Sequence, residues 1–176
     1  KSGEILLPQG KKLRAQELGF LAALGITEVA AYRKPRVAVI SSGDEVVPFD
    51  RKPGQGQIRD ANSHAISGLV RACGAEPIAM DIVPDNAGML GESIRNGLAQ
   101  ADVVVLSGGS SVGTRDLMVD AVSSLSGVEI LAHGVAIRPG KPTLLANQLG
   151  KPIIGLPGHP VSALIVAQVF KNSLNN

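Results

Sequence analysis

The sequence predicts an α/β fold, a three-layer α/β/α sandwich built on a mostly parallel sheet. Short continuous apolar runs, such as residues 37–40 and 103–106, alternate with longer segments whose apolar residues recur at helical spacing. Strands without polar–apolar alternation are buried on both faces, which is typical of parallel sheets covered by helices. In such sheets ligands bind beyond the carboxyl ends of the strands, so the loops there are the first place to look for a site.

The first half of the chain predicts two strands separated by a helix. Residues 37–40 form a buried strand that runs into the polar loop 41–45. From Ala61 onward apolar residues recur at helical spacing; Asp60 or Asn62 can cap this helix and Gly74 can end it. Residues 77–83 predict the next strand.

The second half repeats this order. Asp85 or Asn86 begins a helix that precedes the strand at 102–106. A glycine-rich loop then leads into a helix that starts near Leu117. The remaining expected elements are strands around 128–137, 143–146 and 153–155, and a last helix that starts at Pro160, a residue suited to a first helical position.

We expect two parts: residues 1–34, an interdomain junction segment with a leading helix, and residues 35–176, the α/β domain. The last helix is apolar nearly all round, so it needs cover on every side. Burial within this domain and cover by another domain or subunit both remain open.

Composition narrows the class of protein. Hydrophobic residues make up 44% and charged residues 18% of the 176, as in globular domains. Aromatics are 2% and Trp is absent, which argues against a surface that stacks nucleic-acid bases. There is neither an apolar run long enough to span a membrane nor a signal-peptide core, so we expect a cytoplasmic protein. The single Cys73 allows no internal disulfide, and its helical pattern predicts burial.

The loop at residues 108–113 lies between a strand and a helix. Its glycines allow close approach of backbone N–H groups to a ligand, and the helix N-terminus favours an anion. The loop is not a P-loop, because Lys and Ser or Thr do not follow in register. A phosphate or pterin site and a simple tight turn both remain open.

The segment Arg138-Pro139-Gly140-Lys141-Pro142 holds two cations on a stiff turn. Arg138 can bind an oxyanion such as phosphate or molybdate with a bidentate fork, and Lys141 can act as a point charge. The alternative is a solvated turn without a ligand.

Acidic residues follow several strands. Asp44 and Glu45 come after the first strand, Asp85 after the second, and Asp116 after the glycine-rich loop. In a parallel sheet these positions share one edge, where clustered oxygen ligands suit Mg²⁺. Helix capping is the alternative role for Asp85 and Asp116. The three histidines lack mutual metal-binding spacing, although His159 could face a pocket.

Five motifs in order resemble the central domain of the molybdopterin molybdenumtransferases, bacterial enzymes related to the E domain of gephyrin. Ser42-Gly43-Asp44-Glu45 comes first, Arg59-Asp60-Ala61-Asn62-Ser63 second, and the glycine-rich loop with Asp116 third. Arg138-Pro139-Gly140-Lys141-Pro142 is the fourth, and Gly155-Leu156-Pro157-Gly158 with Pro160 is the fifth. Each motif alone is weak, but together they are specific and span the whole chain.

The resemblance implies a reaction in which adenylylated molybdopterin and molybdate give molybdenum cofactor and AMP with the help of Mg²⁺. It also implies roles for single residues. The catalytic and metal-binding positions are Glu45, Asp85 and Asp116. The substrate-binding positions are Ser42, Gly43, Asp44, Asp60, Asn62, Gly108, Gly109, Ser110, Ser111, Gly113, Arg138, Lys141, Pro157, Gly158 and Pro160.

The chain departs from the family at Gly134, where some relatives carry a lysine, so one cation for molybdate is absent there. The resemblance further implies a homo-oligomer, a dimer in the full-length family, and a molybdopterin adenylyltransferase as a partner. Two alternatives remain: a molybdopterin adenylyltransferase of the same fold, and a non-catalytic module that binds pterin or a protein partner.

Overall fold

The computed structural model describes residues 5–108 and 117–174, with side chains as far as residue 169. The chain divides into two compact units, residues 1–33 and residues 34–176. No helix in the described residues is both long and apolar enough to cross a membrane.

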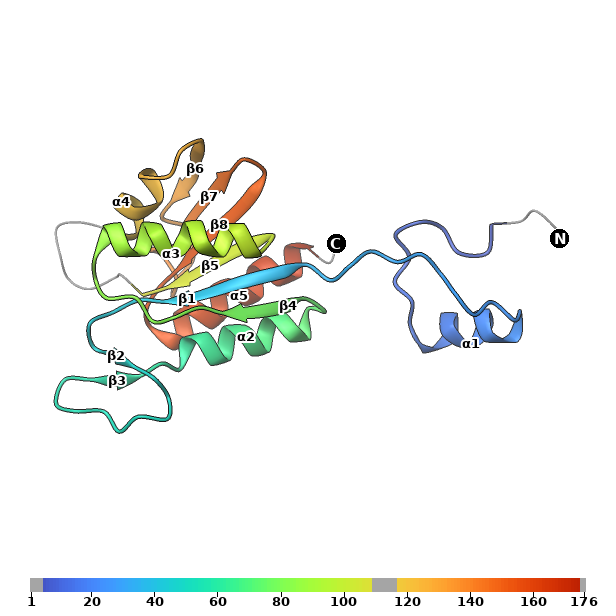
Figure 1. Ribbon diagram of the computed structural model, residues 1–176, viewed down its shortest axis with the longest axis horizontal. Coiled ribbons are helices and arrows are strands. Elements are labelled where there is room, and N and C mark those ends of the chain that lie inside the picture. Colours follow the sequence, from blue (N-terminus) through green and yellow to red (C-terminus); the bar gives the residue numbers. More distant parts are fainter. Residues whose placement is uncertain (1–4, 109–116, 175–176) are drawn as a thin grey trace. The chain divides into compact units, whose positions relative to one another are not determined.

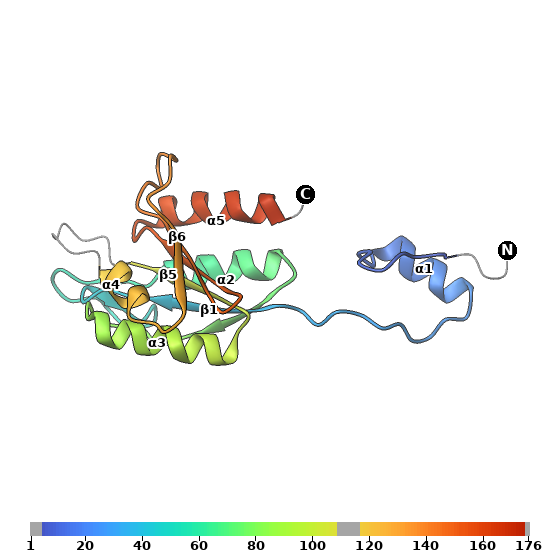
Figure 2. The same cartoon turned by 90° about the horizontal axis from the view of Figure 1, so that it is seen from above.

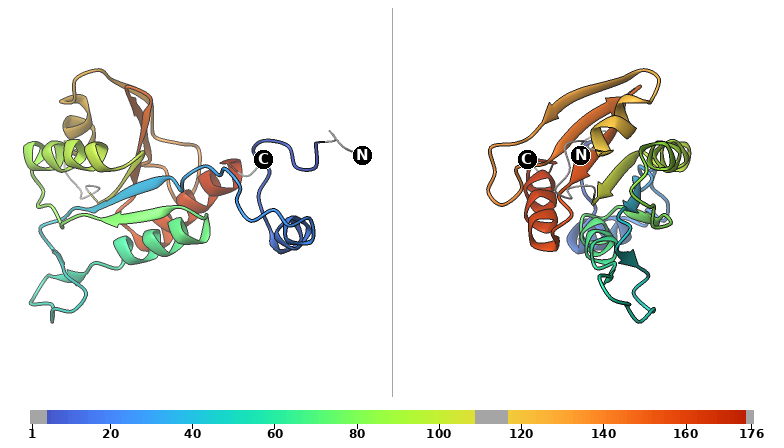
Figure 3. Two further views of the ribbon diagram at one scale, coloured as in Figure 1. Left: turned by 45° about the vertical axis from the view of Figure 1, so that its right-hand side comes forward. Right: turned by 90° about the vertical axis from the view of Figure 1, so that its left-hand side faces the viewer.

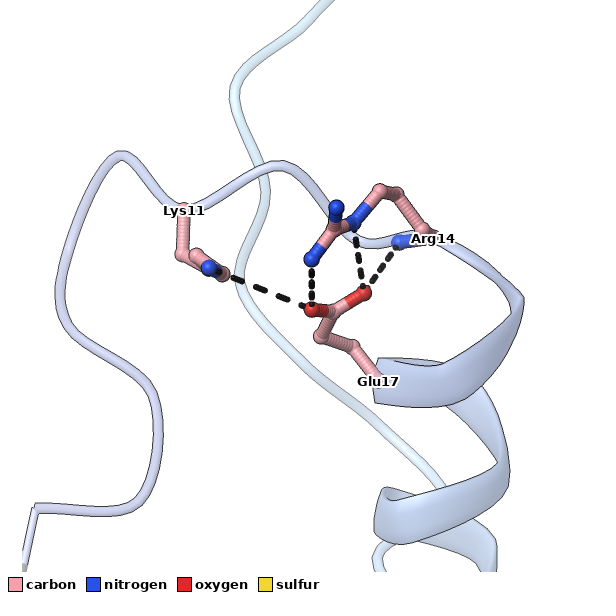
Figure 4. A network of polar contacts seen from close by, with 3 residues as sticks. All are labelled: Lys11, Arg14 and Glu17. Carbon is pink, nitrogen blue, oxygen red and sulfur yellow. Dashed lines mark hydrogen bonds and ion pairs between the residues drawn. The ribbon is translucent and has the colours of Figure 1, made fainter.

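The first unit contains one helix, α1 (Ala15–Ala23). Its start is held by the Glu17 carboxylate, which accepts a hydrogen bond from the Arg14 backbone N–H across 3.0 Å. The same carboxylate pairs with the Arg14 guanidinium at 2.8 Å, and Lys11 lies 4.0 Å away (Figure 4). The Arg14 hydrogen bonds hold the pKa of Glu17 at about 2. A carboxylate in the first turn satisfies a backbone donor that a helix leaves without a partner.

The second unit is built on a six-stranded sheet of order β4-β1-β5-β8-β7-β6 (Figure 1). The strands are β1 (Arg36–Ser41), β4 (Glu76–Ala79), β5 (Val103–Ser107), β6 (Val128–His133), β7 (Leu144–Gln148) and β8 (Lys151–Leu156). The pairs among β4, β1, β5 and β8 are parallel, and β7 is antiparallel to both of its neighbours. The prediction of a mostly parallel sheet is confirmed.

Helices cover both faces of this sheet, which confirms the three-layer prediction. On one face lie α3 (Ala87–Gln100) and α4 (Leu117–Ser123), and on the other lie α2 (Asn62–Ala72) and α5 (Pro160–Leu174) (Figures 2 and 3). The central strand β1 serves both layers. Ala38 and Ile40 pack with the α3 side, whereas Val37 and Val39 pack with the α2 and α5 side. Alternate residues of a strand point to opposite faces, which explains why this run is apolar throughout.

Two expected strands are shorter than predicted. β4 ends at Ala79, although the N–H groups of Met80 and Val83 still donate to carbonyls of β1 at 3.0 and 2.9 Å. β6 ends at His133 instead of continuing to residue 137. Gly134 follows in the left-handed region at φ 88°, which terminates the strand.

The prediction that Cys73 is buried is wrong. Cys73 is exposed because it is the C-cap of α2, one position beyond the last residue of the helix. Sequence reasoning also missed a second small sheet, formed by the two-residue parallel strands β2 (Val46–Val47) and β3 (Ile58–Arg59).

Helix α5 is buried within this domain on one face only. Ala163 and Val166 are fully buried against the sheet. The outward face remains partly exposed, and its apolar members are Val161, Leu164, Ile165 and Val169.

Candidate functional site

The carboxyl ends of β1, β5 and β8 meet at one edge of the sheet, at the left in Figure 1, where β1 leads toward β2. Backbone hydrogen bonds extend this edge beyond the strands. The Ser42 N–H donates to the Ser107 carbonyl at 2.8 Å, and the Gly43 N–H donates to the Val83 carbonyl at 3.0 Å. The loops that follow three neighbouring strands are therefore held side by side.

A cavity of about 320 Å³ opens at this edge. Its lining comes from the ends of β1 and β5, the β2–β3 pair, the start of α2 and the turn before α5. The lining residues are Ser41, Ser42, Glu45, Val46, Ile58, Arg59, Asp60, Ala61, Asn62, Asp85, Ser107, Gly108, Gly158, His159 and Pro160.

Asp60, a residue that lines this cavity, is held in place by two hydrogen bonds. Its Oδ1 atom accepts hydrogen bonds from the Ser41 hydroxyl at 2.9 Å and from the Ser63 backbone N–H at 3.0 Å. The side chain is buried, so these donors compensate for the loss of water. Asp60 thus ties the first turn of α2 to the end of β1, and it orients the residues on either side of it.

Asn62 lines the cavity and carries a buried acceptor without a partner among the described residues. Its Nδ2 donates to the carbonyl oxygen of Gly158 at 2.8 Å, which sets the orientation of the amide because a carbonyl can only accept. Its Oδ1 is buried and has no hydrogen-bond partner in the part of the chain that the structure describes. A buried acceptor in this condition is costly unless a ligand supplies an N–H or O–H group.

The acidic residues Asp44, Glu45 and Asp85 lie close enough to influence one another. The Asp85 backbone N–H donates to Asp44 Oδ1 at 3.0 Å. Burial, and then the neighbouring Asp44 and Glu45 charges, raise the pKa of Asp85 above its ordinary value. Asp85 Oδ1 is also buried without a partner among the described residues. The helix-capping role considered for Asp85 belongs instead to Asn86, whose side chain accepts from the Met89 N–H at 3.0 Å.

Gly108 permits the close packing at the head of the cavity. It has φ +125°, and a Cβ atom there would overlap the Ser42 carbonyl and hydroxyl. Only glycine tolerates this combination of backbone angle and contact. The residues that follow in the predicted glycine-rich loop, Gly109, Ser110, Ser111 and Gly113, lie outside the described residues, as does Asp116.

The Arg138 and Lys141 loop lies at the same edge by topology but does not line this cavity. β6 runs parallel to β8, because both are antiparallel to β7, so residues 134–143 leave the sheet at its carboxyl edge. The loop is closed by a hydrogen bond from the Gly134 N–H to the Thr143 carbonyl at 2.8 Å. It packs on α5, where a Cβ at Gly140 would overlap Val166.

Eight of the residues predicted for substrate or metal binding line the cavity: Ser42, Glu45, Asp60, Asn62, Asp85, Gly108, Gly158 and Pro160. Gly43 and Asp44 line a second cavity of about 590 Å³, which shares Val46 and Asp60 with the first. Pro157 is buried and lines neither.

Sequence reasoning did not select Arg59, Ser41 or Ser107. Arg59 belongs to the second of the five motifs, but no role was assigned to it. The only further indication in the sequence is its positive charge close to the predicted site residues Asp60 and Asn62. His159 lines the cavity, as considered from the sequence. In residues 5–108 and 117–174, no group of three or more His, Cys, Asp or Glu side chains is arranged to hold a metal ion.

A cavity lined by charged and polar residues among apolar ones, at the carboxyl edge of a mostly parallel sheet, is typical of a ligand-binding α/β domain. A family model described as "Probable molybdopterin binding domain" matches residues 38–176. The chain belongs to this family.

Named relatives agree with the family. The molybdopterin molybdenumtransferase of Nostoc sp. is 44% identical over 168 residues, which are 94% of this chain and 38% of the relative. The enzyme of that name from Haemophilus influenzae is 37% identical, with 94% of this chain and 40% of the relative covered. The chain therefore spans about two fifths of the length of these curated relatives. The family and these relatives carry names from molybdopterin biosynthesis.

Solved structures show the same fold. The molybdopterin biosynthesis moeA protein from Pyrococcus horikosii superposes with a TM-score of 0.79 at 37% identity, covering 94% of this chain and 42% of that one. The MoaB protein from Thermus has a TM-score of 0.58 at 20% identity and covers 77% of this chain and 89% of its own. At that identity the second comparison concerns the fold alone.

Proposed function

We propose that this chain is the cofactor-handling domain of a molybdopterin molybdenumtransferase, which inserts molybdate into adenylylated molybdopterin and releases AMP in molybdenum cofactor biosynthesis. One observation carries the proposal: residues from four separate motifs, among them Ser42, Asn62, Gly108 and Gly158, line a single cavity. A cavity of about 320 Å³ is within the size range of small-molecule sites.

The chain's own residues bind and orient the nucleotide in this proposal. Gly108 lets the ligand approach the backbone where β5 ends, and Asn62 offers a buried acceptor to a ligand N–H or O–H group. Asp60 holds the start of α2 rigid through its bonds to Ser41 and Ser63. Positioning of this kind lowers the entropic part of a reaction barrier.

Glu45 and Asp85 fit a Mg²⁺ ion. Both line the cavity, and Asp85 carries a buried oxygen without a partner among the described residues. Its raised pKa reflects burial and repulsion by Asp44 and Glu45, and a cation would offset both effects. We assign Asp116 as a third ligand. When bound, the ion would neutralise charge on the phosphoanhydride of the substrate.

Molybdate is a substrate, and we assign Arg138 and Lys141 to hold it. Both side chains are exposed on a loop at the carboxyl edge, where no carboxylate neutralises them within the described residues. Arginine suits a tetrahedral oxyanion because its donors form a fork. With glycine at position 134, these two residues carry the cationic charge of this loop.

The remaining parts of the proposal concern the whole protein. We propose residues 1–34 as an interdomain junction segment with a leading helix and residues 35–176 as the molybdopterin-binding α/β domain. We also propose that the whole protein is a dimer and is cytoplasmic. A molybdopterin adenylyltransferase would supply its substrate.

The test replaces the corresponding domain of the Nostoc relative with this chain and follows AMP release from adenylylated molybdopterin. We expect release that requires both molybdate and Mg²⁺. Glu45→Gln and Asp85→Asn should each lower the rate at least tenfold, whereas Glu92→Gln, an exposed charge on α3, should leave it unchanged. A folded chimera whose Glu45→Gln and Asp85→Asn variants turn over at the rate of the unmutated chimera would refute the site assignment.

The same chimera separates the two alternatives. Consumption of ATP with molybdopterin, without need for preformed adenylate, would indicate an adenylyltransferase. Tight binding of AMP with no turnover under any condition would indicate a non-catalytic binding module.

A further inference from the structure

The charges that line the cavity are unbalanced for a phosphate-bearing ligand. Among the described lining residues, Glu45, Asp60 and Asp85 are acidic, and Arg59 is the one Lys or Arg side chain. Three carboxylates repel a phosphate unless a cation meets it, and Arg59 is the cation that these lining residues supply in addition to the proposed Mg²⁺. We propose that Arg59 binds the phosphate of the nucleotide part of the ligand; this inference rests on the proposed function and deepens it.

The backbone around Arg59 is fixed on both sides. The Ile58 N–H donates to the Glu45 carbonyl and the Asp60 N–H donates to the Val47 carbonyl, each at 2.8 Å. These bonds are the β2–β3 pairing, and the anchored Asp60 side chain follows directly. The small second sheet therefore fixes the backbone of Arg59, which lines the cavity.

The guanidinium is oriented by one hydrogen bond and otherwise available. Arg59 Nε donates to the Arg51 carbonyl oxygen at 3.1 Å. Within the part of the chain that the structure describes, its two Nη groups have no recorded partner, and no carboxylate lies within ion-pair distance. The Nη edge can therefore donate two parallel hydrogen bonds to a tetrahedral oxyanion.

Arg59 is exposed and has no ion pair among the described residues, and it differs from Arg95, of which both are also true, in lining the cavity. Arg14, by comparison, is paired with Glu17 at 2.8 Å. Arg59 lines the same cavity as Glu45 and Asp85, yet its guanidinium bonds to a backbone carbonyl instead. This arrangement keeps its charge unneutralised until a ligand arrives.

The test compares the binding of AMP with that of adenosine, which differ only in the phosphate, by calorimetry on the full chain. We expect wild type to bind AMP at least tenfold more tightly than adenosine. Arg59→Gln should weaken AMP binding by about tenfold or more, the range for a lost charge-assisted hydrogen bond, and leave adenosine binding within twofold. Arg59→Lys should lie between, because lysine keeps the charge but not the fork.

Arg95→Gln is the matched control, since it removes an exposed arginine of α3 outside the cavity. Thermal unfolding of each variant shows that it is folded. The role of Arg59 is overturned if the ratio of the AMP and adenosine affinities is the same in Arg59→Gln as in wild type, or if wild type binds the two ligands equally well. Neither result contradicts the nucleotide site itself. Failure of wild type to bind either ligand overturns this inference and the nucleotide site of the proposed function together.

Free molybdate shares the tetrahedral oxyanion chemistry, so it provides the second arm. Sodium molybdate is titrated into wild type and Arg59→Gln. We expect the same affinity in both, because Arg59 is assigned to the phosphate ester. An effect of Arg59→Gln on molybdate but not on AMP overturns the assignment.

Discussion

The side-chain amide of Asn62 donates to the carbonyl oxygen of Gly158 across 2.8 Å, and this bond joins the start of α2 to the turn before α5. The two residues are 96 positions apart, so the bond closes one wall of the cavity between distant segments. The Asn62 nitrogen holds this wall, and its Oδ1 atom is buried without a hydrogen-bond partner among the described residues.

Replacing Asn62 should therefore affect stability according to the chemistry of the new side chain. Asn62→Ala removes one partly buried hydrogen bond and should cost about 1 kcal/mol. Asn62→Asp should cost more at neutral pH, because a carboxylate would face the Gly158 carbonyl. Urea unfolding measures both, with Asn96→Ala on the exposed side of α3 as control. An Asp variant as stable as wild type would contradict the amide orientation.

Gly108 and Gly68 should respond in opposite ways to alanine. Gly108→Ala forces a side chain at positive φ against Ser42 and should cost more than about 2 kcal/mol. Gly68 lies within α2 with open space around it, so Gly68→Ala should stabilise by about 0.5–1 kcal/mol. Thermal unfolding distinguishes them, and similar melting temperatures would refute the close contact.

Asp85→Asn should stabilise the domain at neutral pH while lowering the proposed activity at least tenfold. The folded-state pKa of Asp85 is raised above its ordinary 3.8 by burial and then by Asp44 and Glu45. The stability that its protonated form contributes is thus present below pH 3.8 and is lost as pH rises through the higher folded value. The free energy of unfolding, measured from below pH 3.8 to neutral pH, should rise in the variant relative to wild type as pH rises. A constant difference would exclude a shifted Asp85.

Glu17 should titrate in the opposite sense. Hydrogen bonds from Arg14 lower the pKa of Glu17 from 4.5 to about 2, so its contribution to the stability of α1 is present above pH 4.5 and is lost as pH falls through 2. NMR titration of the side-chain carboxyl carbon measures the midpoint directly. Arg14→Gln should move that midpoint back toward 4.5, and a wild-type midpoint already near 4.5 would contradict the network in Figure 4.

Most of the fold could be predicted because the signals were local and repeated. The run at residues 37–40 is apolar at every position because Ala38 and Ile40 serve one helical layer and Val37 and Val39 the other. Pro160 and Gly74 mark the start of α5 and the end of α2 as expected. The prediction that Cys73 is buried failed because periodicity identifies a helix face but not the residue at which the helix ends.

Site residues that come directly after a long apolar strand could be predicted from the sequence. Site residues that lie within very short paired strands could not. Ser42, Asp85 and Gly108 come directly after apolar runs or their extensions. Arg59 is brought to the cavity by two-residue strands, which are too short to leave a pattern in the sequence. Likewise, no local pattern in the sequence signals that the Asn62 amide donates to the Gly158 carbonyl, 96 positions away.

The reversed direction of β7 decides where the Arg138 loop emerges. β7 is antiparallel to both β6 and β8, so residues 134–143 connect two adjacent strands by a single hairpin loop and need no crossover along the sheet. That loop falls at the end of the sheet where β5 and β8 also finish, and Gly140 within it lies against Val166 of α5. One antiparallel strand inserted into a parallel order thus adds a further loop to the edge that carries the cavity.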